Sequence, residues 1–157
     1  MNTKIVKEWI TESGLKAYVV VGLTGTYNGY VAVDKDSPYY ELDYYVGSVD
    51  FDDLDKWDDK KKCIAQAYLN EIEVHGGLTF SGNLLDTNEC VFGFDCSHAW
   101  DHGSQELALE TFPEEKKYID TYFNVTKPFM LDASFKDLDY VVKQCEKLAD
   151  QLMTKES

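Results

Sequence analysis

An apolar stripe at helical spacing runs through the C-terminal segment and constrains the fold more than any other feature. Ser134, followed by Asp137 three residues later, resembles a capping box in which Asp replaces the usual Glu. A helix with one apolar face needs a second layer to cover it, so we predict a helix over 134–153 that packs on a sheet. The stripe consists of Leu138, Val141, Val142, Cys145, Leu148, Ala149 and Leu152.

The second layer is predicted from short β-branched and aromatic runs that are separated by glycine-rich turns. Another helix is predicted over 52–69, where acidic residues lead an apolar pattern, and a short one near 114–123. The segment 3–10 suits either a helix or a strand, and 103–130 is otherwise expected to be irregular. We predict a single α+β domain over 1–157, with a mixed or antiparallel sheet of about five strands and two main helices packed on it. The predicted strands are 16–22, 30–33, 71–75 and 90–95, with a further short one within 39–51.

The charge of the chain limits its partners. The formal net charge is −14, from 29 acidic and 15 basic residues, and every basic residue is a lysine. Such a chain does not suit direct binding of duplex nucleic acid, because phosphate contacts need a basic face. A phosphorylated ligand would have to be held by lysine, by backbone N–H groups or by a metal, since the guanidinium fork of arginine is absent.

Location and cysteine chemistry are predicted from absences in the sequence. No apolar run approaches about 20 residues, and the start lacks the apolar stretch of a signal peptide, so we expect a cytoplasmic protein without membrane contact. No C-x-x-C pair is present, which excludes a zinc ribbon. Cys63, Cys90, Cys96 and Cys145 are therefore expected to be reduced and buried as small hydrophobic side chains.

All three histidines lie in residues 75–103, a segment that contains no lysine. His98, Asp101 and His102 have i, i+3, i+4 spacing, so one helical turn would place them on a single face. Together with His75 they form a candidate site for a divalent metal, Zn²⁺ or Mn²⁺, although histidines beside acids commonly serve only as hydrogen-bonding groups. Asp95 ends a predicted strand and is the candidate catalytic base.

The same segment contains a candidate ligand-binding site. Gly76 and Gly77 follow a predicted strand, where they would allow a ligand to approach the backbone or would form a bulge or tight turn. Aromatic side chains nearby could stack on a planar ligand. The predicted ligand-binding residues are His75, Gly76, Gly77, Asp95, His98, Trp100, Asp101 and Tyr30.

Several blocks together resemble a family of small uncharacterised phage and prophage proteins. The most specific blocks are H-G-G-L-T-F from His75 and G-F-D-C-S-H-A-W-D from Gly93, and the resemblance extends over about 14–152. Family members often carry cysteine at the position of Asn28 and histidine at the position of Ser37, two candidate ligands that this chain lacks. The resemblance implies an accessory protein in the cytoplasm of an infected bacterial host, and it implies no specific activity.

Three functions are open at the level of the sequence. The first is a non-enzymatic accessory protein, with an anti-defence role, that sequesters a small nucleotide-like ligand in the region of His75 and 95–102. The second is a metal-dependent hydrolase that uses the same residues. The third is an acidic protein that masks a basic surface of a host defence component. The absence of arginine and of a known catalytic motif favours binding over catalysis, and a homo-oligomer is compatible with all three.

Overall fold

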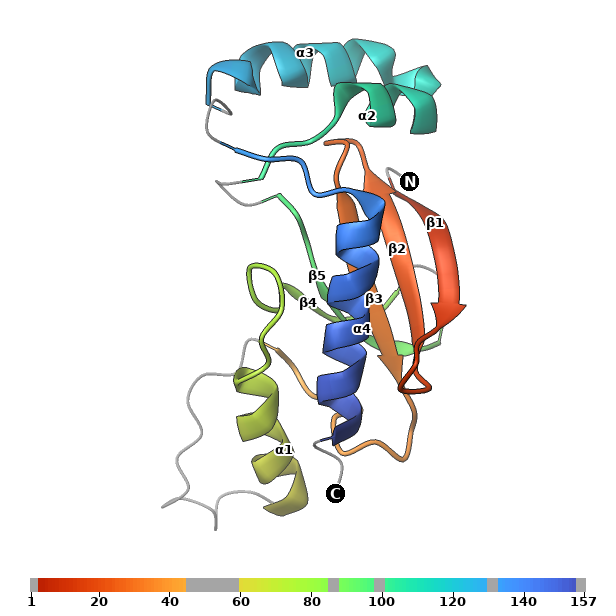
Figure 1. Cartoon of the computed structure of the whole chain (residues 1–157), viewed down its shortest axis with the longest axis vertical. Coiled ribbons are helices and arrows are strands. Elements are labelled where there is room, and N and C mark those ends of the chain that lie inside the picture. The colour runs from red at the N-terminus through yellow and green to blue at the C-terminus, as the bar shows by residue number, and fades with distance from the viewer. Residues whose placement is uncertain (1–2, 45–59, 85–87, 98–100, 130–132, 155–157) are drawn as a thin grey trace.

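The computed structural model describes residues 3–44, 60–84, 88–97, 101–129 and 133–154. In this part of the chain an antiparallel five-stranded sheet has the order β1-β2-β3-β5-β4 (Figure 1). The strands are β1 (Thr3–Ile10), β2 (Lys16–Gly22), β3 (Tyr27–Val33), β4 (Phe80–Asn83) and β5 (Cys90–Phe94). The helices are α1 (Lys60–Asn70), α2 (Gln105–Thr111), α3 (Lys116–Thr126) and α4 (Leu138–Thr154), with short 3₁₀ turns at Pro113–Glu115 and Lys127–Phe129. The predicted α+β class is confirmed.

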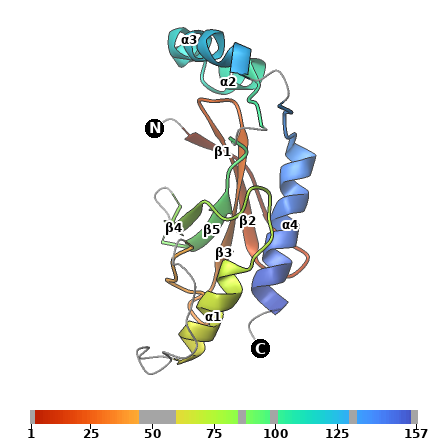
Figure 2. The same ribbon diagram turned by 90° about the vertical axis from the view of Figure 1, so that its left-hand side faces the viewer.

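The two faces of the sheet bury different side chains. Helix α4 lies along one face, whereas α2 and α3 lie beyond one end of the sheet and α1 near the other (Figures 1 and 2). Val19, Val31 and Phe92 point to the α4 side and form the main core with the helix. Tyr18 and Val20 point to the opposite side, as the alternation of a strand requires. Both faces of β2 are therefore buried, which explains its unbroken apolar run.

The C-terminal helix is confirmed, but its predicted start is wrong. Helix α4 begins at Leu138, and its cap is Asp137, whose Oδ1 accepts a hydrogen bond from the Tyr140 N–H at 2.9 Å. Ser134 instead forms an isolated parallel bridge with Asp101. Asp137, which the sequence pattern suggested as the second residue of a capping box, is therefore the cap itself.

The predicted strand over 71–75 is also wrong. These residues form a turn and an irregular segment after α1, and the Gly77 N–H donates to the Val74 carbonyl at 2.8 Å. The Glu73 N–H donates to Gln151 of α4 rather than to a neighbouring strand. Apolar alternation over five residues was not sufficient, because glutamine side chains of α4 satisfy the backbone donors that a strand would otherwise pair.

Several shorter elements differ from the predictions in extent. The ambiguous segment 3–10 is the edge strand β1, and the short helix near 114–123 corresponds to α3. Helix α2 was not predicted; it begins after Ser104, whose Oγ accepts a hydrogen bond from the Leu107 N–H at 3.1 Å. The structure shows turns over 39–41, the described beginning of another predicted strand, whereas 45–51 lies outside the described residues, as does the first part of the predicted helix 52–69.

The segment that leads into α2 crosses the β2–β3 turn at very short range. A Cβ atom at Gly103 would lie 1.7 Å from the Thr24 carbonyl oxygen. The Ser104 N–H donates to the Gly25 carbonyl at 2.9 Å, which holds the two backbones together. Close backbone approach therefore requires glycine at this position.

We therefore expect Gly103→Ala to destabilise the protein by about 1–3 kcal/mol, the usual range for overpacking, because a backbone rather than a flexible side chain has to move. Urea unfolding followed by circular dichroism measures the change. Lys35→Ala, in the exposed loop after β3, is the control and should be close to neutral. Equal stability of Gly103→Ala and the control would show that the two segments do not make this contact.

The structure also bears on membrane contact. None of the helices among the described residues combines the length and the apolar character that crossing a bilayer requires. The longest of them, α4, carries charged residues along its exposed side.

Candidate functional site

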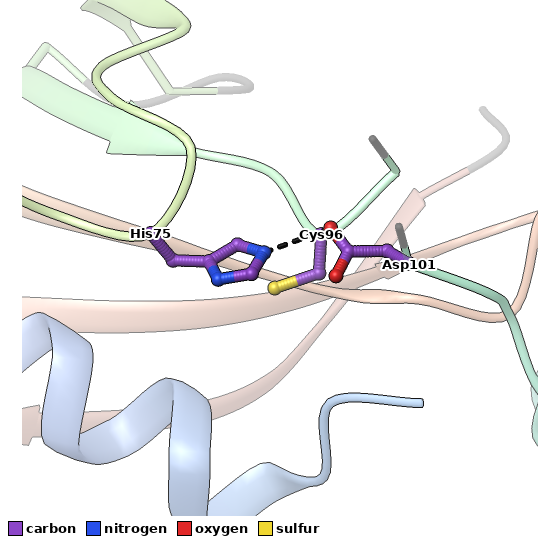
Figure 3. Close-up of side chains that lie close together, drawn as sticks. All are labelled: His75, Cys96 and Asp101. Carbon is purple, nitrogen blue, oxygen red and sulfur yellow. Dashed lines mark hydrogen bonds and ion pairs between the residues drawn. The ribbon is translucent and has the colours of Figure 1, made fainter. Parts of the chain in front are cut away.

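Three side chains of types that can ligate a metal come from separate segments and meet beside the core. His75, Cys96 and Asp101 each offer one donor atom, and these atoms all lie within 4.8 Å of one another. Figure 3 shows the imidazole directed toward the other two side chains. Within the described part of the chain, no other group of three or more His, Cys, Asp or Glu side chains satisfies this criterion. We call these three residues the donor cluster.

His75 is held from both sides of its ring. Its Nε2 lies 2.8 Å from Asp101 Oδ2, and its Nδ1 lies 2.8 Å from the Tyr140 hydroxyl. Because a carboxylate only accepts hydrogen bonds, Nε2 carries a hydrogen, and in the neutral imidazole Nδ1 accepts from Tyr140. The His75 N–H donates to Gln144 Oε1 at 2.9 Å, so α4 positions both the backbone and the ring. The side chain is only 6% exposed.

Cys96 lies two residues beyond the end of β5. Its N–H donates to Asn28 Oδ1 at 3.1 Å, which extends the contact between β3 and the β5 segment. Burial, reinforced by the Asp101 and Asp95 carboxylates, raises the pKa of the Cys96 thiol to about 12. Burial therefore favours the thiol over the thiolate that a reactive nucleophile would need.

Asp101 is fully buried and faces two cationic or hydrogen-bonding partners. Its Oδ1 lies 3.1 Å from Lys136 Nζ, while Oδ2 accepts from His75. The Lys136 side chain is 16% exposed and also donates to Oγ and to the carbonyl of Ser134. The backbone bridge to Ser134 and the bond from the His102 N–H to the Ser134 carbonyl, at 3.0 Å, fix the position of Asp101.

Tyr140 completes the surroundings of the donor cluster. Its ring packs edge-on against the His75 ring at 5.4 Å, and Lys136 Nζ lies 6.0 Å from the centre of the Tyr140 ring. Burial, with the neighbouring Cys96 and Asp101, raises the pKa of Tyr140. The phenol therefore stays neutral, and its hydroxyl can either donate to His75 or accept from it.

The structure brings together only part of the predicted site. His75 and Asp101 are in contact, as expected. The predicted helical turn over His98, Asp101 and His102 is wrong for the last two residues. Residues 101–104 are not helical, and Asp101 forms a backbone bridge with Ser134. His102 Nδ1 lies 3.0 Å from the Gly103 carbonyl oxygen, and His102 is not part of the donor cluster. His98 and Trp100 lie outside the described residues.

The remaining predicted residues have local structural positions. Asp95 Oδ1 accepts from the Ser97 N–H at 3.1 Å in a turn after β5. Gly76 has a φ of 68° within the turn that presents His75, and Gly77 has a φ of 79°. Tyr30 packs edge-on against Phe80 at 5.5 Å on the face of the sheet opposite Cys96, so it does not reach the donor cluster.

Three important residues escaped sequence analysis. Cys96 was interpreted as a core side chain, which is correct for its burial but omits its place beside His75. Lys136 and Tyr140 lie more than 30 residues from the histidine-rich segment and carry no motif. The only local signal for Cys96 was its position next to Asp95, just beyond the end of a strand.

A pocket of about 260 Å³ lies elsewhere, at the edge of the sheet near β4. Its lining is mainly polar and includes Glu41, Asp43, Asn83 and Asn88. His75, Cys96 and Asp101 do not line it, so the pocket and the donor cluster are separate features.

Comparisons with protein-family models, with curated proteins and with solved structures found no match for this chain. The donor cluster and its neighbours therefore supply the chemistry that bears on function. This chemistry consists of one imidazole, one thiol and one carboxylate, with a lysine at the carboxylate.

Proposed function

We propose that this protein is a metal-dependent binding protein whose donor cluster holds one Zn²⁺ ion. The observation that carries the proposal is the approach of His75, Cys96 and Asp101 donor atoms to within 4.8 Å of one another. Ligand atoms around a tetrahedral zinc ion lie roughly 3.3–3.8 Å apart, since each lies about 2.0–2.3 Å from the metal, so the donor atoms would shift by about 1 Å. Only small side-chain movements are needed to receive the ion.

The chemistry of the donors favours zinc over manganese. Thiolate and imidazole suit borderline and soft ions, whereas manganese and magnesium prefer sites made of oxygen ligands. The presence of Cys96 thus selects Zn²⁺ from the two ions considered on the sequence. On binding, the buried thiol releases its proton, because a metal takes the thiolate form of cysteine.

Tyr140 supports this proposal from outside the donor cluster. When His75 ligates through Nε2, its remaining hydrogen resides on Nδ1 and needs an acceptor. The Tyr140 hydroxyl already lies 2.8 Å from Nδ1 and can accept that hydrogen. The Tyr140 hydroxyl can therefore hydrogen-bond to His75 Nδ1 in both states, as the donor without metal and as the acceptor with metal.

Three protein donors leave one tetrahedral position for a water molecule or a ligand oxygen. We propose a small nucleotide-like anion as its occupant, since a metal can hold phosphate in a chain with a charge of −14 and no arginine. Sequestration is favoured over hydrolysis because the donor cluster is almost fully buried. The phage accessory and anti-defence setting rests on the sequence resemblance alone.

A titration of the metal-free protein with Co²⁺, a spectroscopic substitute for Zn²⁺, tests the metal site. We expect one equivalent to bind with a visible spectrum that includes sulfur-to-metal charge transfer, and Zn²⁺ to displace it. His75→Gln, Cys96→Ser and Asp101→Asn should each weaken binding by about tenfold or more, since each removes a ligand.

The chain offers a matched control for each of these changes. His102→Gln, Cys63→Ser and Asp36→Asn alter the same residue types outside the donor cluster and should bind Co²⁺ as the parent does. Circular dichroism establishes that each variant is folded. Absence of Co²⁺ binding by the parent, or equal losses in the three controls, would contradict the proposed metal site.

The nucleotide ligand needs a separate test with the zinc-loaded protein. Cyclic and ADP-ribose-type nucleotides are incubated with it, the protein is heat-denatured, and the soluble fraction is assayed. Sequestration predicts stoichiometric uptake and intact release, whereas hydrolysis predicts a new product in catalytic amount. Retention of no nucleotide, with salt-sensitive capture of a basic host protein, would instead support surface masking.

A further inference from the structure

We propose that Lys136 acts as an internal cation that competes with the metal for Asp101 and leaves the donor cluster when the metal binds. The inference rests on the proposed metal site and concerns its regulation. Its consequence is that metal uptake is coupled to the segment that begins α4, because Lys136 lies two residues before the helix.

The contacts of Asp101 place Lys136 in direct competition. Both carboxylate oxygens are engaged, with His75 Nε2 at Oδ2 and Lys136 Nζ at Oδ1, 3.1 Å away. The Asp101 side chain is fully buried and that of Lys136 is 16% exposed, so water screens the pair weakly. A buried carboxylate of this kind requires a positive partner, and in the metal-free protein Lys136 provides it.

A bound metal changes the charge of the donor cluster. Without metal, the Asp101 carboxylate and the Lys136 ammonium, 3.1 Å apart, form a neutral pair. With Zn²⁺ bound to the Cys96 thiolate and the Asp101 carboxylate, those three charges already cancel. An ammonium that stayed at Asp101 would then leave a net positive charge in a poorly hydrated place, so its departure restores neutrality.

The surroundings of Lys136 allow it to leave. Its ammonium also contacts the hydroxyl and carbonyl of Ser134, an exposed residue, and lies 6.0 Å from the centre of the Tyr140 ring. A lysine side chain is long enough to keep its stem packed while its charged end moves to water. Ser134 also forms the backbone bridge to Asp101. Movement of Lys136 would therefore disturb the segment 134–137, which connects this bridge to the start of α4.

The experiment compares Co²⁺ affinity of the parent with that of Lys136→Gln. We expect Lys136→Gln to bind roughly tenfold more tightly, within the usual range for coupling between two sites. Lys136→Arg keeps the charge and should stay near the parent or bind more weakly. Lys143→Gln, an exposed change on α4, removes the same charge from the chain and is the matched control.

Salt concentration separates the local effect from the general one. The gain of Lys136→Gln should persist at high salt because the ion pair is buried, whereas any gain of Lys143→Gln should disappear. Unchanged or weaker binding by folded Lys136→Gln, or a gain no larger than that of Lys143→Gln, would overturn the inference. Absence of Co²⁺ binding in both the parent and Lys136→Gln would instead overturn the metal site itself.

Discussion

Asp101→Ala is expected to lower the free energy of unfolding of the metal-free protein by about 3 kcal/mol, near the lower end of the range for breaking a buried ion pair. The change removes the carboxylate that faces His75 and Lys136, and it leaves both partners in a poorly hydrated place. The exposed fraction of Lys136 lets its ammonium reach water in part, which keeps the loss from being larger. Guanidinium unfolding in the presence of a chelator measures the difference.

Two further variants sharpen this measurement. Asp36→Ala, in an exposed loop, should be almost neutral. Asp101→Asn should be milder than Asp101→Ala, because the amide oxygen can still accept the hydrogen bond from His75 Nε2. If Asp101→Ala is as stable as Asp36→Ala, the buried network contributes nothing to folding, and Asp101 has no structural role in the metal-free protein.

Leu148→Ala should destabilise the protein by about 2–5 kcal/mol, the range for a large-to-small change in a packed core. Leu148 is fully buried at the centre of the face of α4 that packs on β2 and β3. The loss combines the transfer of the missing methyl and methylene groups with the cavity that they leave. Thermal and chemical unfolding of the metal-free protein are both suitable measurements.

The neighbouring position supplies the control for this change. Lys147 is exposed on the same turn of α4, so Lys147→Ala keeps the helix while leaving the core untouched. We expect a change within about 0.5 kcal/mol for Lys147→Ala. Similar stabilities of the two variants would mean that α4 does not pack through Leu148.

The destabilisation by Asp101→Ala and the tighter metal binding by Lys136→Gln have a common origin. Both depend on one carboxylate that serves a lysine in the metal-free protein and would serve a metal ion in the loaded one. A protein with this arrangement should gain stability from metal by RT ln(1 + C/Kd), where C is the free Zn²⁺ concentration, so tighter binding gives a larger gain at the same metal concentration. The stabilisation by Zn²⁺ should therefore be greater in Lys136→Gln than in the parent.

The sequence by itself determined those helices and strands whose apolar pattern lies within the segment itself. The stripe of α4 and the apolar runs of β2 and β5 predict their structures because periodicity reflects which face of a segment is buried. The sequence likewise identified His75 and Asp101 as members of one site, because both lie in a short segment with an unusual composition. All four cysteines are free and buried, as the absence of a C-x-x-C pair led us to expect.

The tertiary structure decided the features that depend on partners distant in the chain. Residues 71–75 alternate as a strand does, yet α4 glutamines take their backbone donors, and no local pattern reports that choice. Asp137 caps α4 because Ser134 is engaged by the Asp101 segment. Lys136, just before α4, and Tyr140, in its first turn, come to lie beside Asp101, His75 and Cys96 only in the tertiary structure. Side chains form a site when they lie close together in space. The spacing of residues along the chain does not report that distance, because the packing of the helices on the sheet sets it.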